Sequence, residues 1–229
     1  TLKMNSYFVK TDSAYREMKA YHKVRIFRKD IQGVCDSLLF SSKDSCLRMY
    51  HDPIIWNEKQ QLLGEEINVY MNDSTIDWAH IINQALTVEQ KDSIHYNQIS
   101  GKEIKAYFQG GEARKIDVIG NVLVIYYPEE KDSTMIGMNT SETSLLNLHL
   151  MNRKMEKMVM SPKSNGTLYP MDQIPVDKMK LPTFVWFDYI RPQNKEDIFN
   201  WRGKKSGETL RKTTRKPVTS PKRELNKLN

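Results

Sequence analysis

The sequence of 229 residues has no long apolar run. None of its stretches reaches the roughly 18 consecutive apolar residues that a bilayer-spanning helix needs, so the sequence predicts no transmembrane helix. The chain begins Thr1-Leu2-Lys3, with neither an initiator Met nor the apolar core of a signal peptide. We therefore expect a processed or trimmed fragment that has lost its targeting signal.

Catalytic and metal-binding motifs are also missing. The sequence contains no Cys-x-x-Cys, no Gly-x-Ser-x-Gly and no phosphate-binding loop, and its histidines form no pair spaced by four on an expected helix. A working active site needs a convergent set of acids, bases or ligands. The sequence therefore predicts a protein that is not an enzyme, with no metal and no cofactor. The scattered histidines are His22, His51, His80, His95 and His149.

Cysteine is scarce, and the two residues present leave the redox compartment open. If residues 41–45 form a hairpin turn, Cys35 and Cys46 do not lie directly opposite one another. Because disulfide geometry is strict, we expect free, half-buried thiols, with a disulfide as the alternative.

The net charge of +7 is concentrated at one end of the chain. Residues 202–229 hold ten Lys or Arg and two Glu, which leaves 25 basic and 26 acidic residues in positions 1–201. The rest of the chain therefore has no overall attraction for phosphates. The tail has almost no apolar residues and no Tyr or Phe to stack on bases, so we expect a disordered segment without a specific nucleic-acid partner. Such a tail is typical of a solubilising element or a nonspecific contact with nucleic acid or an anionic membrane.

A repeat is the strongest pattern that the sequence does contain. Tyr21-His22 recurs as Tyr50-His51, and the segments that follow Gly64 and Gly101 carry apolar residues three, five and seven positions on. The same count holds after Gly120, and after Gly33 it fails only at the first position, which is Asp36. Alternation of period two predicts half-buried β-strands. Turn-forming clusters at residues 41–45, 71–74, 109–112 and 128–133 separate them, which indicates many short antiparallel strands.

Four further predictions concern the less regular segments. Residues 76–91 have partly helical spacing, but the neighbouring repeats favour two strands at 76–82 and 84–89. Leu146, Leu148 and Leu150 alternate as in a strand, and Asn165-Gly166 predicts a hairpin turn. Prolines then break residues 170–195 into short pieces, a composition that covers an open sheet edge more readily than it extends one.

These repeats resemble the OstA-like (organic solvent tolerance) family of lipopolysaccharide-transport proteins, in the form found in Bacteroidetes. The resemblance lies in an ordered series of weak motifs and covers roughly residues 1–140, extending through Trp201. The matching segments are His22-Lys-Val-Arg-Ile26, Gly33-Val-Cys-Asp-Ser-Leu38 with Phe40, Gly64-Glu-Glu-Ile67 and Gly120-Asn-Val122.

The resemblance implies an all-β protein, an open, elongated β-jellyroll of repeated antiparallel strand pairs whose apolar trough shields the acyl chains of lipid A during transfer to the outer membrane. It also implies a location in the periplasm, possible association with the outer membrane, edge-to-edge β pairing with other lipopolysaccharide-transport proteins, and a possible homo-oligomer. The expected organisation is jellyroll repeats at 1–140, further strands and a Pro-rich capping segment at 141–201, and the basic tail at 202–229.

The repeat also predicts which side chains would line the trough. Sequence alone does not separate a trough from the closed core of a structural or adhesive β-repeat protein, which is the alternative function. Lys23, Arg25, Lys102 and Lys105 are expected on the polar strand faces, either at a phosphate-binding rim or simply in solvent. The predicted lining residues are Leu38, Phe40, Ile67, Val69, Met71, Ile104, Ala106, Phe108, Leu123, Ile125 and Tyr127.

Overall fold

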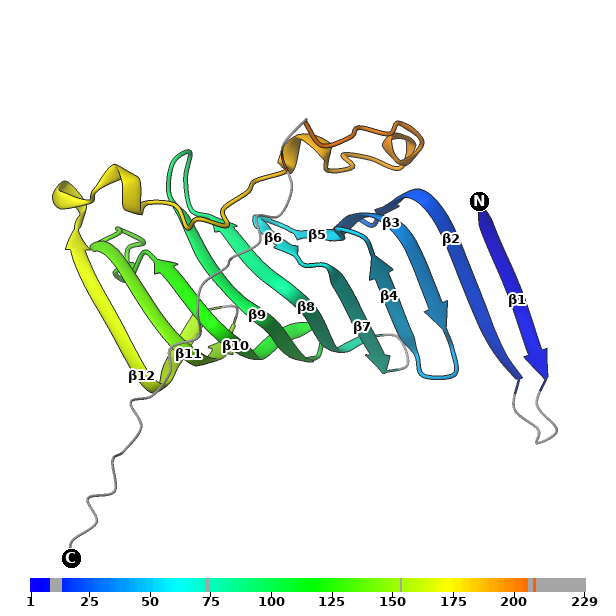
Figure 1. The fold of residues 1–229 in the computed structure, drawn as a ribbon, viewed down its shortest axis with the longest axis horizontal. Coiled ribbons are helices and arrows are strands. Elements are labelled where there is room, and N and C mark those ends of the chain that lie inside the picture. The colour runs from blue at the N-terminus through cyan, green and yellow to red at the C-terminus, as the bar shows by residue number, and fades with distance from the viewer. Residues whose placement is uncertain (9–13, 73–74, 153, 206–207, 209–229) are drawn as a thin grey trace, which may run out of the picture.

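The computed structural model describes residues 1–8, 14–72, 75–152, 154–205 and 208. They form one antiparallel sheet of twelve strands in which neighbours in the chain are mostly neighbours in the sheet (Figure 1). The predicted all-β class is confirmed. The strands are β1 Leu2–Phe8, β2 Ala14–Phe27, β3 Ile31–Ser41, β4 Cys46–Tyr50, β5 Ile54–Asn57, β6 Gln60–Leu63, β7 Glu66–Asn72, β8 Thr75–Gln90, β9 Tyr96–Gln109, β10 Glu112–Tyr126, β11 Gly137–Met151 and β12 Lys154–Pro170.

Four pairs of residues with left-handed backbone lie in a line across the sheet. They are His22-Lys23 in β2, His51-Asp52 between β4 and β5, Asn83-Gln84 in β8 and Gly120-Asn121 in β10, with φ between 48° and 81°. Where such a pair lies inside a strand, the register shifts, as expected of a bulge that bends the strand. We call this line of residues the fold line.

The fold line divides the sheet into two halves, which can be followed in Figure 1. The lower half contains β4 and β7, and the upper half contains β5 and β6, which pair with the upper parts of β3 and β8. Strands β2, β3, β8, β9 and β10 run through both halves. A long strand that bends at the fold line therefore occupies the same place in the sheet as two short strands joined by a corner.

Two apolar clusters occupy opposite faces of this sheet. Successive residues of a strand point to opposite faces, and Val124 belongs to one cluster whereas Ile125 belongs to the other. The first cluster takes side chains from both halves, for example Ile67 from the lower and Val122 from the upper half. We call its side the inner face, because bending at the fold line brings the two halves together there, and the opposite side the outer face.

Residues 171–205 form a strap that covers the outer face of the upper half. The strap contains four short 3₁₀ turns, η1 Met171–Gln173, η2 Val176–Lys178, η3 Asp188–Ile190 and η4 Glu196–Phe199. It leaves the end of β12 and passes back over the sheet toward β3 (Figure 1). Leu181, Phe187 and Ile190 are buried in the second cluster with residues such as Trp56. The Pro-rich segment thus covers a face, whereas the sequence predicted that it covers an edge.

Three local predictions can be compared with the structure. Residues 76–91 are the strand β8 up to Gln90, which confirms the β interpretation, with Asn83-Gln84 as its bend. The predicted hairpin at Asn165-Gly166 is wrong, because both residues lie within β12 and pair with Glu142 and Ser141. The turns at 41–45 and 109–112 are confirmed between β3 and β4 and between β9 and β10. Most of the basic tail lies outside the described residues.

Two glycines near the fold line differ in the space that an added Cβ would have, and this difference tests the packing of the bent sheet. A Cβ on Gly101 would lie 2.6 Å from Val118 Cγ1 and 3.3 Å from the Ile119 carbonyl oxygen, whereas at Gly33 the nearest atom would be the flexible Met49 Cε at 3.4 Å. We expect Gly101→Ala to lower the free energy of unfolding by about 1–3 kcal/mol, because it overpacks the sheet. Gly33→Ala should change it by less than about 1 kcal/mol. Urea unfolding of both variants measures this, and equal losses would contradict the packing described here.

Candidate functional site

The inner face of the lower half brings together most of the predicted lining residues. Leu38, Ile67, Val69, Ile104 and Ala106 are buried members of the inner cluster, and Phe108 packs against it. Phe40 and Met71 follow Leu38 and Val69 by two positions, which places them on the same face. Cross-strand pairs join the series from strand to strand, as in Ile67↔Ile81 and Ile81↔Ile104.

Burial on this inner face decreases with distance from the fold line. On β7, Ile67 is 1% exposed and Val69 8%, whereas Met71 is half-buried. Ile104, Ala106 and Phe108 repeat the trend on β9. On the upper half, Val122 and Val124 are buried but Tyr126 is half-buried. The inner face is therefore closed along the fold line and partly exposed along both margins.

The other three predicted lining residues lie elsewhere. Ile125 and Tyr127 are buried members of the outer cluster, and Leu123 packs against it. Leu123 and Ile125 belong to the upper half of β10 and Tyr127 directly follows it, and the strap residues of the same cluster cover them. The assumption that all eleven residues share one face is therefore wrong. Gly120 belongs to the bend at Gly120-Asn121, and this bend shifts the alternation of the residues that were counted from Gly120.

Strand pairing gives the true equivalence of the repeats. Tyr21, Tyr50, Ile82 and Ile119 stand in one row across the sheet, and each directly precedes a left-handed pair. Gly120 therefore corresponds to His22 and His51, not to Gly64 and Gly101. Counting from Gly33 was similarly displaced, since Leu38 pairs with Met49 and Met49 with Ile67. The displacement explains why Asp36 interrupted the apolar count.

The basic residues expected on polar strand faces do not form one rim. Lys23 and Lys102 are exposed and Lys105 is half-buried, but the side chain of Arg25 is 1% exposed. Arg25 lies under the strap, with its Nη2 3.6 Å from Asp197 Oδ2, and its guanidinium nitrogens have no hydrogen-bond partner. Burial lowers the pKa of Arg25. The pKa of Asp197 is lowered first by the backbone N–H of Gln193, with Arg202 and Arg25 adding to the effect.

Buried glutamines hold the strap on the outer face. Gln61 Nε2 donates to the Val185 carbonyl oxygen at 2.9 Å, and Gln61 Oε1 accepts from the Phe187 N–H at 2.7 Å and from Trp56 Nε1 at 3.2 Å. Gln98 repeats the arrangement: its Nε2 donates to the Met179 carbonyl oxygen and its Oε1 accepts from the Leu181 N–H, both at 2.8 Å. Each amide therefore satisfies two backbone groups of the strap.

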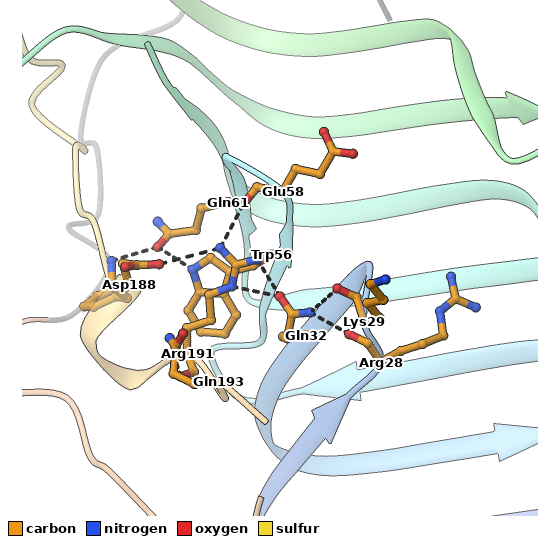
Figure 2. Close-up of polar contacts among 10 residues, drawn as sticks. Arg28, Lys29, Gln32, Trp56, Glu58, Gln61, Asp188, Arg191 and Gln193 are labelled. Carbon is orange, nitrogen blue, oxygen red and sulfur yellow. Dashed lines mark hydrogen bonds and ion pairs between the residues drawn. The ribbon is translucent and has the colours of Figure 1, made fainter. Parts of the chain in front are cut away.

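Arg191 fixes the strap farther toward β3. Figure 2 shows its guanidinium between Gln32 and Glu58. Its Nε donates to Gln32 Oε1 at 2.8 Å, its Nη1 donates to the Glu58 carbonyl oxygen at 2.8 Å, and an ion pair joins Nη1 to Asp188 at 3.6 Å. Gln32 Nε2 in turn donates to the carbonyl oxygens of Arg28 and Lys29.

Sequence reasoning missed this set of glutamines, although a signal for two of them was present. Gln61 and Gln98 each stand three residues before a repeat glycine, Gly64 and Gly101. Extending the repeat backwards by three positions would have found both. A buried, polar but uncharged side chain needs hydrogen-bond partners. Its recurrence at one position of the repeat therefore predicts that one segment supplies these partners on one face of the sheet.

The remaining polar and titratable groups include the histidines, the acids and the two cysteines. Among residues that the structure describes, no three or more His, Cys, Asp or Glu side chains are grouped so that they could hold a metal ion. Cys35 and Cys46 are free and fully buried, as expected except for the degree of burial. Desolvation raises the pKa of the Cys35 thiol to about 12. In the same described part, no helix is long and apolar enough to cross a membrane.

The class that these observations define is an all-β protein with one bent antiparallel sheet and a C-terminal strap. Neither a scan against protein-family models nor a search of curated proteins finds a match for this chain. Among solved structures, the chain is similar to LptH, the LptA-homologous periplasmic component of the conserved lipopolysaccharide transport device from Pseudomonas aeruginosa. The identity is 14%, the similarity covers 61% of this chain and 95% of that chain, and the TM-score is 0.46. A likeness at this level assigns no function to this chain.

Replacing a clamping glutamine should weaken the strap. Gln98→Ala leaves the part-buried Met179 carbonyl and the buried Leu181 N–H without partners, so we expect a loss of about 1–3 kcal/mol in the free energy of unfolding. Gln60→Ala, an exposed position on β6, should cost less than about 0.5 kcal/mol. Urea unfolding and limited proteolysis within 171–205 measure both variants. A Gln98→Ala protein as stable and as resistant as the Gln60→Ala control would rule out the clamp.

The raised pKa of Cys35 predicts low thiol reactivity. At pH 8 the raised pKa lowers the fraction of Cys35 that is present as thiolate. Alkylation should therefore be slower by roughly a hundredfold or more than in the urea-unfolded chain, and burial adds to the effect. Mass spectrometry after timed iodoacetamide treatment of a Cys46→Ser protein isolates Cys35. Rapid modification of the native form would show that this part of the inner face opens in solution.

Proposed function

We propose that this chain is a periplasmic lipid carrier whose inner face covers the acyl chains of lipopolysaccharide during transfer to the outer membrane. The observation that carries the proposal is the apolar inner face, which is partly exposed along its margins. Each CH₂ group of an acyl chain that is buried there contributes about 0.8 kcal/mol to the free energy of binding, because it is removed from water. The family resemblance of the repeat motifs points to the same ligand.

The margin of the lower half is the proposed entrance for acyl chains. Phe40, Met71 and Phe108 supply large, half-buried apolar side chains there. The thioether of Met71 is flexible and polarisable, which suits a fluid ligand without fixed shape. Leu38, Ile67, Val69, Ile104 and Ala106 lie deeper, toward the fold line, and would form the floor of the site.

The two ends of the sheet provide the proposed contacts with other transport proteins. Strands β1 and β12 are the ends of the strand order, and each has one neighbour among the described strands. An edge strand offers backbone N–H and C=O groups to a further strand. We propose edge-to-edge pairing with other lipopolysaccharide-transport proteins or with a second copy of this chain.

One observation favours the alternative of a structural or adhesive β-repeat protein. Next to the fold line the inner residues bury one another almost completely, with Ile67 1% and Val122 0% exposed. Such packing is also that of a closed core. The margins decide between the two functions, because only a carrier uses them to contact lipid.

Photo-crosslinking from two adjacent residues of β9 tests the proposal. A benzophenone amino acid at position 108 lies on the inner face, and one at position 107 lies on the outer face of the same strand. We expect crosslinks to lipopolysaccharide from position 108 and none from position 107. Equal yields from both positions, or no crosslink from position 108 in folded protein, would favour the closed core.

A charge on the same margin should weaken lipopolysaccharide binding with little effect on the fold. Phe108 is half-buried at the end of β9, so Phe108→Asp places a carboxylate against the proposed acyl chains without opening the fold line. We expect lipopolysaccharide binding to weaken by about tenfold or more. Exposed Gln109→Asp is the matched control. Lipopolysaccharide binding is measured on variants whose circular dichroism is unchanged. Binding by both variants equal to that of the parent protein would contradict the carrier function.

A further inference from the structure

The end of the strap displays two aromatic side chains in solvent. Phe199 is 85% exposed and is the last residue of η4, and Trp201, two residues later, is 42% exposed. Figure 1 shows this end of the strap, in orange, above the β2 and β3 end of the sheet. Large exposed aromatics so close together mark a surface that contacts another molecule rather than an ordinary solvated loop.

Buried contacts on either side hold these aromatics in place. Asp197, 6% exposed at its side chain, accepts from the Gln193 N–H at 3.0 Å and forms ion pairs with Arg25 and Arg202. The Lys205 N–H donates to Tyr189 Oη at 3.0 Å. The segment that carries Phe199 and Trp201 is therefore anchored before and after them, so their exposure is a property of the folded strap.

The surroundings of the two aromatics are basic. Lys195, Arg202 and Lys205 are exposed, and the Lys23 ammonium lies 6.0 Å from the Trp201 ring centroid. The acidic groups nearby are largely compensated, since Asp197 pairs with Arg25 and Arg202, and Asp52 lies 3.5 Å from Lys204. Glu196 is an exposed exception. In the sequence, residues 209–229 add seven basic residues and one acidic residue.

We propose that the end of the strap, residues 195–205, is a docking surface for an anionic phospholipid bilayer. Aromatic side chains with an apolar body insert at the level of the headgroups, and Lys and Arg beside them attract anionic lipid. Charge complementarity selects a bilayer that carries negative headgroups over a neutral one. Residues 1–201 carry a net charge of −1 and residues 202–229 a net charge of +8, so the excess positive charge of the sequence lies at this end of the chain.

A bilayer fits the surface better than a nucleic acid does. A single strand needs ring faces on which successive bases stack along a basic track. Trp201 already has Lys23 over its ring, so that ring face is not free to stack on a base. A membrane contact requires only that one end of the protein reaches the headgroups.

Vesicle binding by the full chain tests the proposal. We expect co-flotation with phosphatidylcholine vesicles that contain phosphatidylglycerol, weaker binding at high salt, and little binding to phosphatidylcholine alone. The double variant Phe199→Ser, Trp201→Ser should lose about tenfold or more in affinity. The control is Val176→Ser, which replaces an 82% exposed apolar residue elsewhere on the strap and should bind like the parent protein.

A second measurement places Trp201 itself in the bilayer. Brominated phosphatidylglycerol should quench the fluorescence of the parent protein, and Trp201→Phe should remove that quenching while the protein still binds. Vesicle binding unchanged by the double variant, or quenching unchanged by Trp201→Phe, would overturn the proposal. So would binding to an oligothymidylate, lost in the double variant, in the absence of vesicle binding. Phe108→Asp should bind vesicles normally, so failure of the lipid-carrier function and failure of this proposal give different results.

Discussion

The left-handed backbone pairs at the fold line are the constraint on which the rest of the architecture depends. Two successive residues with positive φ are unfavourable in a strand, yet they recur in alternate strands at one level of the sheet. At the pairs inside β2, β8 and β10 the strand bends and its register shifts, and because all four pairs lie at one level the bends form a single fold line. Without a shared level, the long strands would give a twisted, open sheet with no enclosed inner face.

Bending creates a second requirement, because it leaves two faces to cover. The inner face is covered by the sheet itself, because its apolar side chains from the two halves pack against one another across the fold line. On the upper half, the outer face carries an equally apolar surface that includes Trp56 and Tyr127, and the strap covers it. Backbone groups in such a segment have no strand partners of their own. The glutamines Gln61 and Gln98 supply partners for four backbone groups of the strap and so hold a segment without strand pairing on the sheet.

The sequence predicted the class of fold well because alternation of period two is local information. Strands, most turns and the β identity of residues 76–91 could be inferred in this way, and Leu38, Ile67 and Ile104 were placed on one face by counting from glycines. Counting failed where the backbone left the period. Leu123, Ile125 and Tyr127 follow a left-handed pair, and Asn165-Gly166 has turn chemistry but pairs with β11 throughout. The strap contacts could not be inferred from local pattern, since Gln61 and Phe187 are 126 positions apart.

The long reach of the strap has a consequence for the order in which the parts of the chain acquire their structure. Arg191 contacts Gln32 across 159 positions, and the strap departs from the last strand of the sheet. Most strands of the sheet pair with the strand that precedes them in the chain, so the sheet can form largely hairpin by hairpin. The apolar surface around Trp56 cannot be covered until nearly all of the chain has been made. A sheet that forms before the strap packs therefore exposes that apolar surface, which favours association with other apolar surfaces until the strap covers it.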